Sequence, residues 1–462
     1  MPSSEPRPLL LNAFEMAVPV HQSPGLWRHP EDRSRDYTSL AHWTRLARTL
    51  EDGGFHGIFF ADVLGQYDVH GGSGDAAARG GVQFPMLDPL LLVPALAAVT
   101  ERIGFGVTAS VSYEHPYALA RRLSTLDHLT GGRVAWNIVT SYQDSAARNL
   151  GQDRQVPHDE RYDRAEEYLD VVYRLWESSF DDDAVVADPA AGVYVDPSRV
   201  RGIGHEGERF SVPGPALVEP SPQRTPLLFQ AGASTRGRAF AAKHAEAVFF
   251  SGPTAEQTAG WVRAVRAEAA GRGRDPRRVK VFSNVNVVVA DTDAEALARL
   301  EDYRRHVDVE AALALFAGWT GVDLSGADPD EPLEHVTTDG NRSALASFTT
   351  LDPDRVWTPR LLAEFVSIGG RGPVLAGSPA TVADGLERWA RVADVDGFNV
   401  NAAVRPGDFE RFARLVSPEL RRRGLLEEPA PGATLRETVL GEGPRLAPDH
   451  YGAGFRPVPA AR

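Results

Sequence analysis

Eight short apolar segments alternate with segments of helical periodicity along the 462-residue chain, and this order constrains the fold more than any other feature. The strand-like segments centre near residues 10, 58, 105, 136, 228, 248, 284 and 399. Between the first two, residues 36–52 place Leu40, Trp43 and Leu46 on one helical face. Strands that alternate with helices form parallel sheets. The sequence therefore predicts an α/β fold, a TIM-like (β/α)8 barrel with insertions and a C-terminal tail.

Three segments do not fit short connections and predict insertions near 64–85, 181–225 and 303–375. The first is rich in glycine and the second in proline, glycine and aspartate. The third is too long for a connection and predicts a helical insertion over one barrel end. We expect one barrel domain over residues 1–425, followed by a tail over 426–462 that packs on the surface or at a subunit interface.

Composition excludes several classes of protein. A net charge of −14 argues against a nucleic-acid partner. The absence of cysteine removes thiolate metal sites, disulfides and cysteine nucleophiles. The 13 histidines show no metal-ligand spacing, so we predict no metal. No segment reaches the ~18 apolar residues of a membrane span or resembles a signal peptide, which predicts a cytoplasmic protein without a membrane partner.

Polar residues stand at the ends of the predicted strands, where barrel active sites lie. Asp62 follows "IFFA", and Thr108 ends the third strand. Asn137 interrupts the apolar run "VAWNIV", and Ser141 follows it. A buried amide needs a partner, so Asn137 either contacts a ligand ring edge or is a satisfied core residue. Asp62 either accepts from a ring N–H or caps the next element.

The segment "FQAGASTRGRAF" (229–240) predicts a strand, a glycine turn and a helix. Unpaired N–H groups at a helix start bind anions, and Ser234 adds a hydroxyl unless it only caps the helix. His158 and Tyr162 share one helical face and can both donate to a phosphate, or they are a surface histidine and a core tyrosine. His21, after the first strand, either faces substrate or is solvated.

Five segments in order resemble one family. They are "WTRLARTLEDGGFHGIFFADVLG" (43–65), "TASVSYEHPYALARRLSTLDHLTGGR" (108–133), "TLDHLTGGRVAWNIVTSYQDSAARNLG" (125–151), "HDERYDRAEEYLDVVYRLW" (158–176) and "FQAGASTRGRAFAAKHAEAVF" (229–249). Together they resemble the nitrilotriacetate, dibenzothiophene-sulfone and pristinamycin-type monooxygenases of the bacterial luciferase-like superfamily. The resemblance covers roughly residues 9–425 and leaves the substrate open.

The resemblance implies a two-component, FMNH2-dependent monooxygenase. A separate NAD(P)H-dependent flavin reductase would supply the reduced FMN, and O2 would add to give a flavin C4a-(hydro)peroxide. That species would oxygenate a small organic substrate, in some members with cleavage of a C–N, C–S or C–C bond. The resemblance also implies a homodimer or homotetramer.

The resemblance assigns roles to individual residues of this chain. The FMN contacts it implies are Asp62, Thr108, Asn137, Ser141, His158, Tyr162, Ser234 and Thr235. The phosphate would lie at His158, Tyr162 and Ser234, and the catalytic candidates are His21 and Asn137. Three alternatives stay open: a riboflavin-degrading, lyase-type member that uses FMNH2 and O2, a deazaflavin-dependent oxidoreductase of the same superfamily, and a flavin-binding protein without catalysis.

Overall fold

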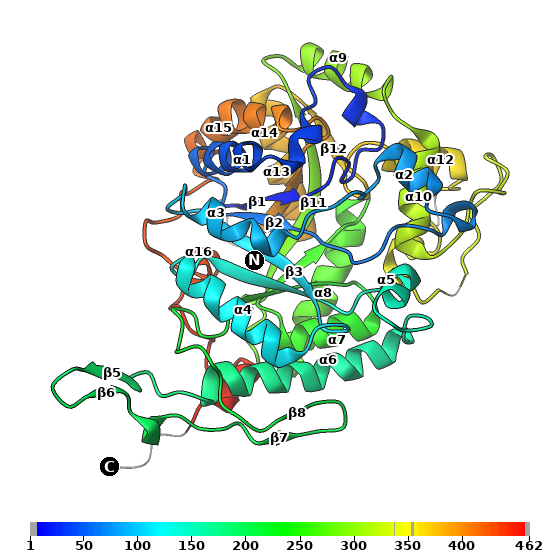
Figure 1. The fold of residues 1–462 in the computed structure, drawn as a ribbon. Helices are drawn as coiled ribbons and strands as arrows, with labels where there is room; N and C mark the ends of the chain where they lie inside the picture. Colours follow the sequence, from blue (N-terminus) through cyan, green and yellow to red (C-terminus); the bar gives the residue numbers. More distant parts are fainter. Residues whose placement is uncertain (1–6, 337, 353–354, 458–462) are drawn as a thin grey trace.

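Eight parallel strands close into a barrel in the computed structural model, which describes residues 7–336, 338–352 and 355–457 (Figure 1). The strands are β1 (Leu10–Glu15), β2 (Gly57–Phe60), β3 (Gly104–Ser110), β4 (Val134–Val139), β9 (Leu227–Ala231), β10 (Ala247–Phe250), β11 (Lys280–Val289) and β13 (Gly397–Asn401). Each pairs in parallel with the next in this order, and β13 pairs with β1 to complete the ring. The eight predicted strands and the predicted barrel are confirmed.

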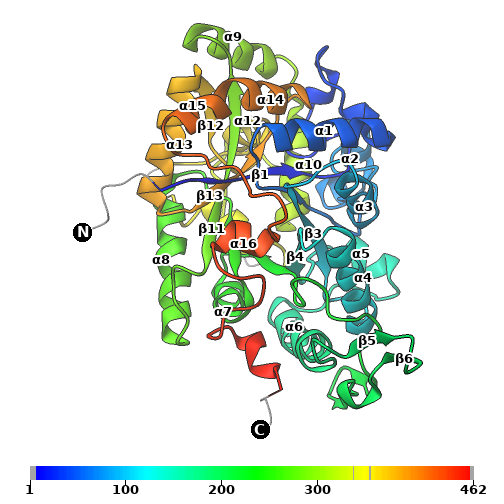
Figure 2. The same ribbon diagram turned by 90° about the vertical axis from the view of Figure 1, so that its left-hand side faces the viewer.

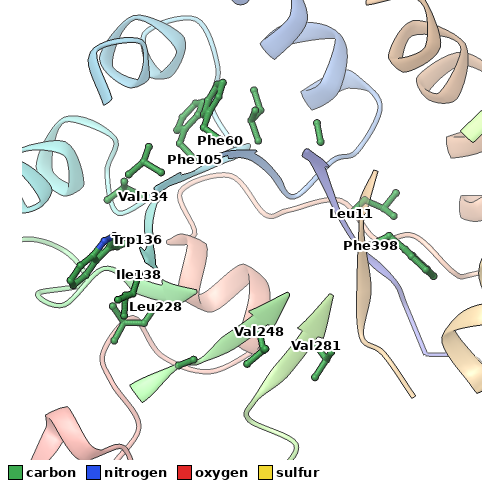
Figure 3. Packing of buried hydrophobic residues seen from close by; sticks show 14 of the residues in the cluster. Leu11, Phe60, Phe105, Val134, Trp136, Ile138, Leu228, Val248, Val281 and Phe398 are labelled. Carbon is green, nitrogen blue, oxygen red and sulfur yellow. The ribbon is translucent and has the colours of Figure 1, made fainter. Parts of the chain in front are cut away.

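Side chains alternate between the two faces of each strand, as the strand period requires. Residues on the outward face, among them Leu11, Trp136 and Phe398, pack beneath the surrounding helices (Figure 3). Residues on the inward face fill the lower barrel interior, where the rings of Phe59 and Phe229 meet edge to face at 5.3 Å. The strands are buried on both faces, which explains why they read as nearly continuous apolar runs.

The outer layer consists of helices that connect successive strands, together with two helices that follow β13 (Figure 1). These helices are α1 (Leu40–Asp52), α3 (Val93–Ala97), α4 (Pro116–Leu129), α5 (Asp144–Asn149), α6 (His158–Tyr173), α7 (Thr235–His244), α8 (Ala255–Gly271), α9 (Asp293–Arg304), α13 (Pro379–Ala393), α14 (Gly407–Arg411) and α15 (Ser417–Arg422). Several begin at a side-chain cap, as in α8, where the Thr254 hydroxyl accepts from the Gln257 amide at 3.2 Å. Among the described residues, no helix has both the length and the hydropathy of a membrane span.

The three segments expected to be insertions contain regular elements of their own. Residues 64–85 hold the short helix α2 (Asp75–Gly80). Residues 181–225 form two hairpins that extend away from the barrel in Figure 1, β5 (Val185–Asp188) with β6 (Val193–Val195) and β7 (His205–Glu206) with β8 (Ser211–Val212). Residues 303–375 hold α10 (Val309–Thr320), α11 (Arg342–Ser347) and α12 (Pro359–Val366).

The helices of the 303–375 segment pack on the loop after β2 and form a second apolar core. In this core Phe348 and Trp357 meet edge to face at 4.9 Å, and Tyr67 belongs to it as well. A further strand, β12 (Val374–Gly377), then pairs with the last residues of β11, outside the ring. The sequence analysis missed β12 because a four-residue strand at the end of an irregular segment carries little periodicity.

Helix α16 (Leu435–Leu440), in the C-terminal tail, closes the amino-terminal mouth of the barrel (Figure 2). Leu435 and Val439 join the apolar interior. Gly104 leaves the space for Leu435, since a Cβ at Gly104 would lie 2.5 Å from Leu435 Cδ1. The tail therefore contributes to the barrel core over this helix. The division into a domain over 1–425 and a tail over 426–462 stays a prediction, and residues 1–6 and 458–462 lie outside the described part of the chain.

A buried ion pair holds α16 in place. Arg436 is 1% exposed and meets Glu246 at two points, with Nε–Oε1 at 2.7 Å and Nη2–Oε2 at 2.8 Å. Its guanidinium also donates to the carbonyl oxygens of Thr225 (2.9 Å) and Pro444 (2.7 Å). Both charges are thus compensated, which a buried pair requires because desolvation of each ion is costly.

We expect Arg436→Ala to lower the free energy of unfolding by about 3–5 kcal/mol, because Glu246 then stays buried without its partner. Urea unfolding followed by circular dichroism measures the change. Arg422→Ala is the matched control, since Arg422 pairs with Glu419 while 70% of its side chain is exposed. Equal midpoints for the two variants would contradict a stabilising role of the buried pair.

Candidate active site

The inward-facing polar residues at the carboxyl ends of β3 and β4 form a short hydrogen-bonded chain. The Thr108 hydroxyl donates to the Phe60 carbonyl oxygen at 2.7 Å, and Asn137 Nδ2 donates to Thr108 Oγ1 at 2.9 Å. Asn137 Oδ1 has no partner among the described residues, although Asn137 is only 4% exposed. A buried acceptor without a donor is costly, so this oxygen is available to a ligand N–H.

Asp62 lies just beyond β2, where two hollows adjoin. It lines a cavity of about 480 Å³ and a second of about 170 Å³, and Val63 lines both as well. Burial raises the pKa of Asp62 from 3.8 to about 8, and the nearby Asp88 carboxylate adds to the shift. Asp62 is therefore largely protonated at neutral pH and can donate a hydrogen bond as well as accept one.

The smaller cavity ends at the amino terminus of α7. Ser234 caps this helix, its hydroxyl accepting from the Gly237 amide at 3.1 Å, and its Oγ lies 3.5 Å from His158 Nε2. Tyr162 is 6% exposed and lines the same cavity. These are the three residues assigned to phosphate, and the fold brings them together although 76 positions separate His158 from Ser234. A helix start with added hydroxyls is an anion site.

His158 connects this end of the cavity to solvent. Its Nδ1 lies 2.6 Å from the carboxylate of Asp159, and burial lowers the pKa of the imidazole. The ring is therefore neutral without ligand, with Nδ1–H donating to Asp159. A phosphate dianion beside Nε2 would favour the protonated ring, which then donates on both sides.

The remaining flavin candidates also lie near this site. Ser141 adopts a φ of +56°, and its hydroxyl lies 2.8 Å from that of Ser110, at the ends of β4 and β3. Ser141 lines the smaller cavity, and Thr235 is the first residue of α7.

His21 lies behind the wall and does not line either cavity. Its side chain is 5% exposed, and its ring packs edge-on against Phe14 with 4.6 Å between centroids. Burial, assisted by the Arg405 charge, lowers the pKa of His21 to about 3, so the ring is neutral. Gln83 Nε2 donates to the His21 carbonyl oxygen at 3.1 Å, and Gln83 itself lines the larger cavity. His21 is thus connected to the wall of the larger cavity only through Gln83.

The sequence predicted that the 303–375 segment lies over one barrel end, but it did not identify which residues of the segment line the site. Arg342 and Ser343, at the start of α11, line the smaller cavity together with Ser234. Gln230, on β9, lines it too, and its Oε1 is buried without a partner among the described residues. No local pattern marks Arg342, because its position depends on how the insertion folds back over the barrel.

One side-chain cluster has the composition of a metal site. His29, Asp302 and His306 place one ligand atom each within 4.8 Å of one another, the one such group among the residues that the structure describes. The Glu31 amide donates to His29 Nδ1 at 3.2 Å, so His29 Nε2 carries the proton and donates to Asp302 at 3.0 Å. The proton occupies the position that a metal would take, and the trio functions as a hydrogen-bonded cluster.

At the carboxyl ends of its strands the barrel has a polar cavity that ends at a site suited to an anion. The similarities to known proteins agree with this fold and this site. The profile of the luciferase-like monooxygenase family matches residues 17–396. The chain is 48% identical to the dimethyl-sulfide monooxygenase of Hyphomicrobium sulfonivorans, over 97% of this chain and 94% of that protein. It is 44% identical to the long-chain alkane monooxygenase of Geobacillus thermodenitrificans, over 97% and 98% of the two chains.

Solved structures extend the similarity to the whole fold. The long-chain alkane monooxygenase structure superposes with a TM-score of 0.90 and covers 98% of this chain and all of that one. A riboflavin lyase structure with modified FMN and riboflavin superposes with a TM-score of 0.91 at 37% identity, over 98% and 100% of the chains. The predicted dibenzothiophene-sulfone, nitrilotriacetate and pristinamycin relatives match as well. The chain belongs to the luciferase-like monooxygenase family and is a flavin-dependent monooxygenase.

We expect the Asp62→Asn variant to gain stability relative to the wild type as pH rises from about 4 to about 8. The native carboxyl, with its raised pKa, holds a proton that the unfolded chain releases above 3.8, so wild-type stability falls across this window and levels off above it. Each unit of difference in pKa is worth about 1.4 kcal/mol. Urea unfolding at several pH values measures the gap.

Asp88→Asn is the control for this pH experiment. It removes the charge that helps raise the pKa of Asp62 and keeps an amide oxygen to cap Leu90. In the Asp88→Asn variant, the pH range over which ionisation of Asp62 lowers stability should therefore end at a lower pH. Parallel stability curves for wild type and Asp62→Asn would show that Asp62 ionises normally.

Proposed function

We propose that this chain is the oxygenase component of a two-component system. It binds FMNH2 supplied by a separate NAD(P)H-dependent flavin reductase and uses O2 to oxygenate a small organic substrate. The observation that carries the proposal is that two neighbouring cavities share Asp62 and Val63 in their walls. One end offers an anion site at Ser234, and the middle offers polar strand ends for a flat, hydrogen-bonding ring.

The residues present are suited to FMN. Two buried acceptors, Asn137 Oδ1 and Gln230 Oε1, have no donor within the described part of the chain, and the ring of a flavin carries N–H groups. Gly237 leaves the helix start open, since a Cβ there would lie 2.9 Å from the Tyr162 hydroxyl. A phosphate at Ser234 can thus approach the backbone closely, as anions at helix starts do.

Reduced FMN would supply the electrons that activate O2. The chain itself would hold the phosphate at Ser234, Tyr162, His158 and Thr235, with Arg342 adding charge from the insertion. The protonated Asp62 carboxyl would donate to a ring acceptor, while Thr108 holds Asn137 in position to accept from a ring N–H. Ser141 would contact the same ligand where the strand ends. The cover formed by the 303–375 segment would exclude water from the reaction.

Of the two catalytic candidates, Asn137 would contact the cofactor directly. His21 would act as a positioning residue, because its backbone carbonyl holds Gln83 and its ring lies 3.4 Å from Gln22 Nε2. The neutral, buried ring suits that role better than proton transfer.

A second candidate function is degradation of riboflavin with FMNH2 and O2. The riboflavin lyase structure that superposes at a TM-score of 0.91 favours it. A deazaflavin-dependent oxidoreductase has weaker support, since the F420-dependent structures are 12% and 14% identical and share the fold alone. We further propose that the protein is cytoplasmic, which is consistent with its cysteine-free composition. We also propose that it forms a homodimer or homotetramer, as the family resemblance implies.

The direct test combines purified protein, FMN, NADH, a generic flavin reductase and candidate substrates. We expect O2 uptake coupled to formation of an oxygenated product, with dimethyl sulfide, medium-chain alkanes and riboflavin as the first probes. Conversion of riboflavin to lumichrome would select the second candidate. Equal turnover without O2, with reduced deazaflavin as donor, would contradict both oxygen-dependent functions.

We expect Ser234→Ala to weaken FMN binding about tenfold and to leave riboflavin binding unchanged, because the hydroxyl would contact only the phosphate. Fluorescence quenching of each flavin measures the two affinities. Ser378→Ala is the matched control, since Ser378 caps α13 by accepting from the Thr381 amide and lies away from the cavity. Loss of a cap alone costs about 1 kcal/mol of stability in each variant. An equal loss of FMN and riboflavin affinity would place Ser234 away from the phosphate.

A further inference from the structure

A group of side chains from separate connections meets above the barrel mouth, and it contains a cation without a counter-ion. This Arg371 cluster consists of Tyr67, Gln83, Tyr142, Trp319 and Arg371. The Tyr67 hydroxyl donates to Gln83 Oε1 at 2.8 Å and lies 2.8 Å from the Tyr142 hydroxyl. The Arg371 guanidinium lies over the Trp319 ring, 5.2 Å from its centroid.

The cluster lies at the proposed site. Gln83 lines the larger cavity beside Asp62, and Tyr142 lines the smaller one beside Ser141. Trp319 comes from α10, in the segment that covers the barrel mouth. Arg371 is half-buried and lines neither cavity itself, but its neighbour Tyr142 lines the smaller one.

The loop between α12 and β12 is shaped to bring Arg371 to this point. Gly369 and Gly370 have φ values of +79° and +69°. A Cβ at Gly369 would lie 2.4 Å from Asn286 Cβ, and a Cβ at Gly370 would lie 2.1 Å from Gln22 Oε1. The backbone thus rests directly on the carboxyl end of β11 and on the loop after β1, and only glycine permits this contact.

The charge of Arg371 is not compensated within the described part of the chain. It makes no ion pair or hydrogen bond there, and its charged or ionisable neighbours are only Tyr67 and Tyr142. Burial raises the pKa of Tyr142 to about 12 and also raises the pKa of Tyr67 well above its usual value, so both phenols are neutral. Burial lowers the pKa of Arg371 to about 10, which leaves it protonated at neutral pH.

The fully buried arginines of the described chain all have hydrogen-bond partners, which are a carboxylate for some and backbone carbonyl oxygens for Arg133, Arg161 and Arg274. Arg405 contacts Glu15 at 2.7 Å, and Arg436 contacts Glu246 at 2.7 Å. A sheltered cation without an anion is costly, and five N–H donors in a planar fork match a carboxylate or sulfonate. Arg371 thus differs from these arginines, and an anionic ligand would supply the partner that the described residues do not provide.

We propose that Arg371 binds the anionic group of the substrate, and that this enzyme therefore acts on a small organic acid, a carboxylate or sulfonate, rather than on a neutral hydrocarbon or sulfide. The inference rests on the proposed function for its reaction and on Arg371 for its substrate class. The acid group would lie between the guanidinium and the Tyr142 hydroxyl. The apolar part would extend toward the larger cavity, where Leu87 and Leu90 form part of the wall.

Binding to the FMN-loaded enzyme, with FMN oxidised so that no turnover occurs, tests the inference apart from catalysis. The probes are matched pairs with and without an acid group: (methylthio)acetate with ethyl methyl sulfide, hexanoate with hexane, and hexanesulfonate with hexane. Isothermal titration and thermal shift report binding. The variants are Arg371→Gln and Arg371→Lys. The control is Arg148→Gln, which removes the same charge from a neighbouring hollow, where Arg148 pairs with Asp68 outside the two cavities described above.

We expect the wild type to bind at least one acid more tightly than its neutral partner. Arg371→Gln should weaken binding of that acid by about 10- to 100-fold, as loss of a charged hydrogen bond does. The affinity for the neutral partner should stay unchanged. Arg371→Lys should recover part of the affinity, and Arg148→Gln should behave as wild type. FMN affinity and melting temperature of each variant report folding.

Two results would overturn the inference. One is a wild type that prefers no acid over its neutral partner anywhere in the panel. The other is an Arg371→Gln variant that keeps acid affinity and instead loses affinity for FMNH2, measured anaerobically, because the guanidinium would then face the reduced ring. Neither result bears on O2 uptake with the reductase, so the proposed function stands or falls separately.

Discussion

Closure of the strand ring is the constraint on which the rest of the structure depends. Once β13 pairs with β1, every strand has one face toward the helices and one face toward a single interior. The strand period of two then decides the direction of each side chain. Trp136 points outward into the helical layer, and its neighbour Asn137 must therefore point inward, where its Nδ2 donates to Thr108 Oγ1.

The interior is divided along its axis into two chemically different halves. The lower half is aromatic and is closed by α16, whose Arg436 is neutralised by Glu246. The upper half is polar, and among the described residues the Asn137 Oδ1 and Gln230 Oε1 acceptors have no partner there, with Gln230 in the wall of the smaller cavity. The lower half supplies stability without ligand, while the upper half leaves polar groups unsatisfied until a ligand arrives. This division locates binding at one end of the barrel.

The residues of the site that the sequence could predict are those that lie at the ends of the strands. Asp62, Thr108 and Asn137 stand at strand ends, so the eightfold pattern was enough to expect them together. Ser234 and His158 were identifiable as anion ligands only by residue type, and their 3.5 Å approach follows from the packing of α6 beside α7. His21 was placed near substrate by its loop, whereas packing against Phe14 turns it behind Gln83.

The sequence by itself determined the fold class, the family and the polar strand ends, because hydrophobic periodicity and local motifs are recorded residue by residue along the chain. The tertiary structure alone decided that α16 closes the barrel, that Arg342 lines the same cavity as Ser234 and that no acid of the described residues lies beside Arg371. Each of these depends on contacts between segments far apart in sequence. The burial and charge balance that make them consequential exist only once the insertion and the tail have folded onto the barrel.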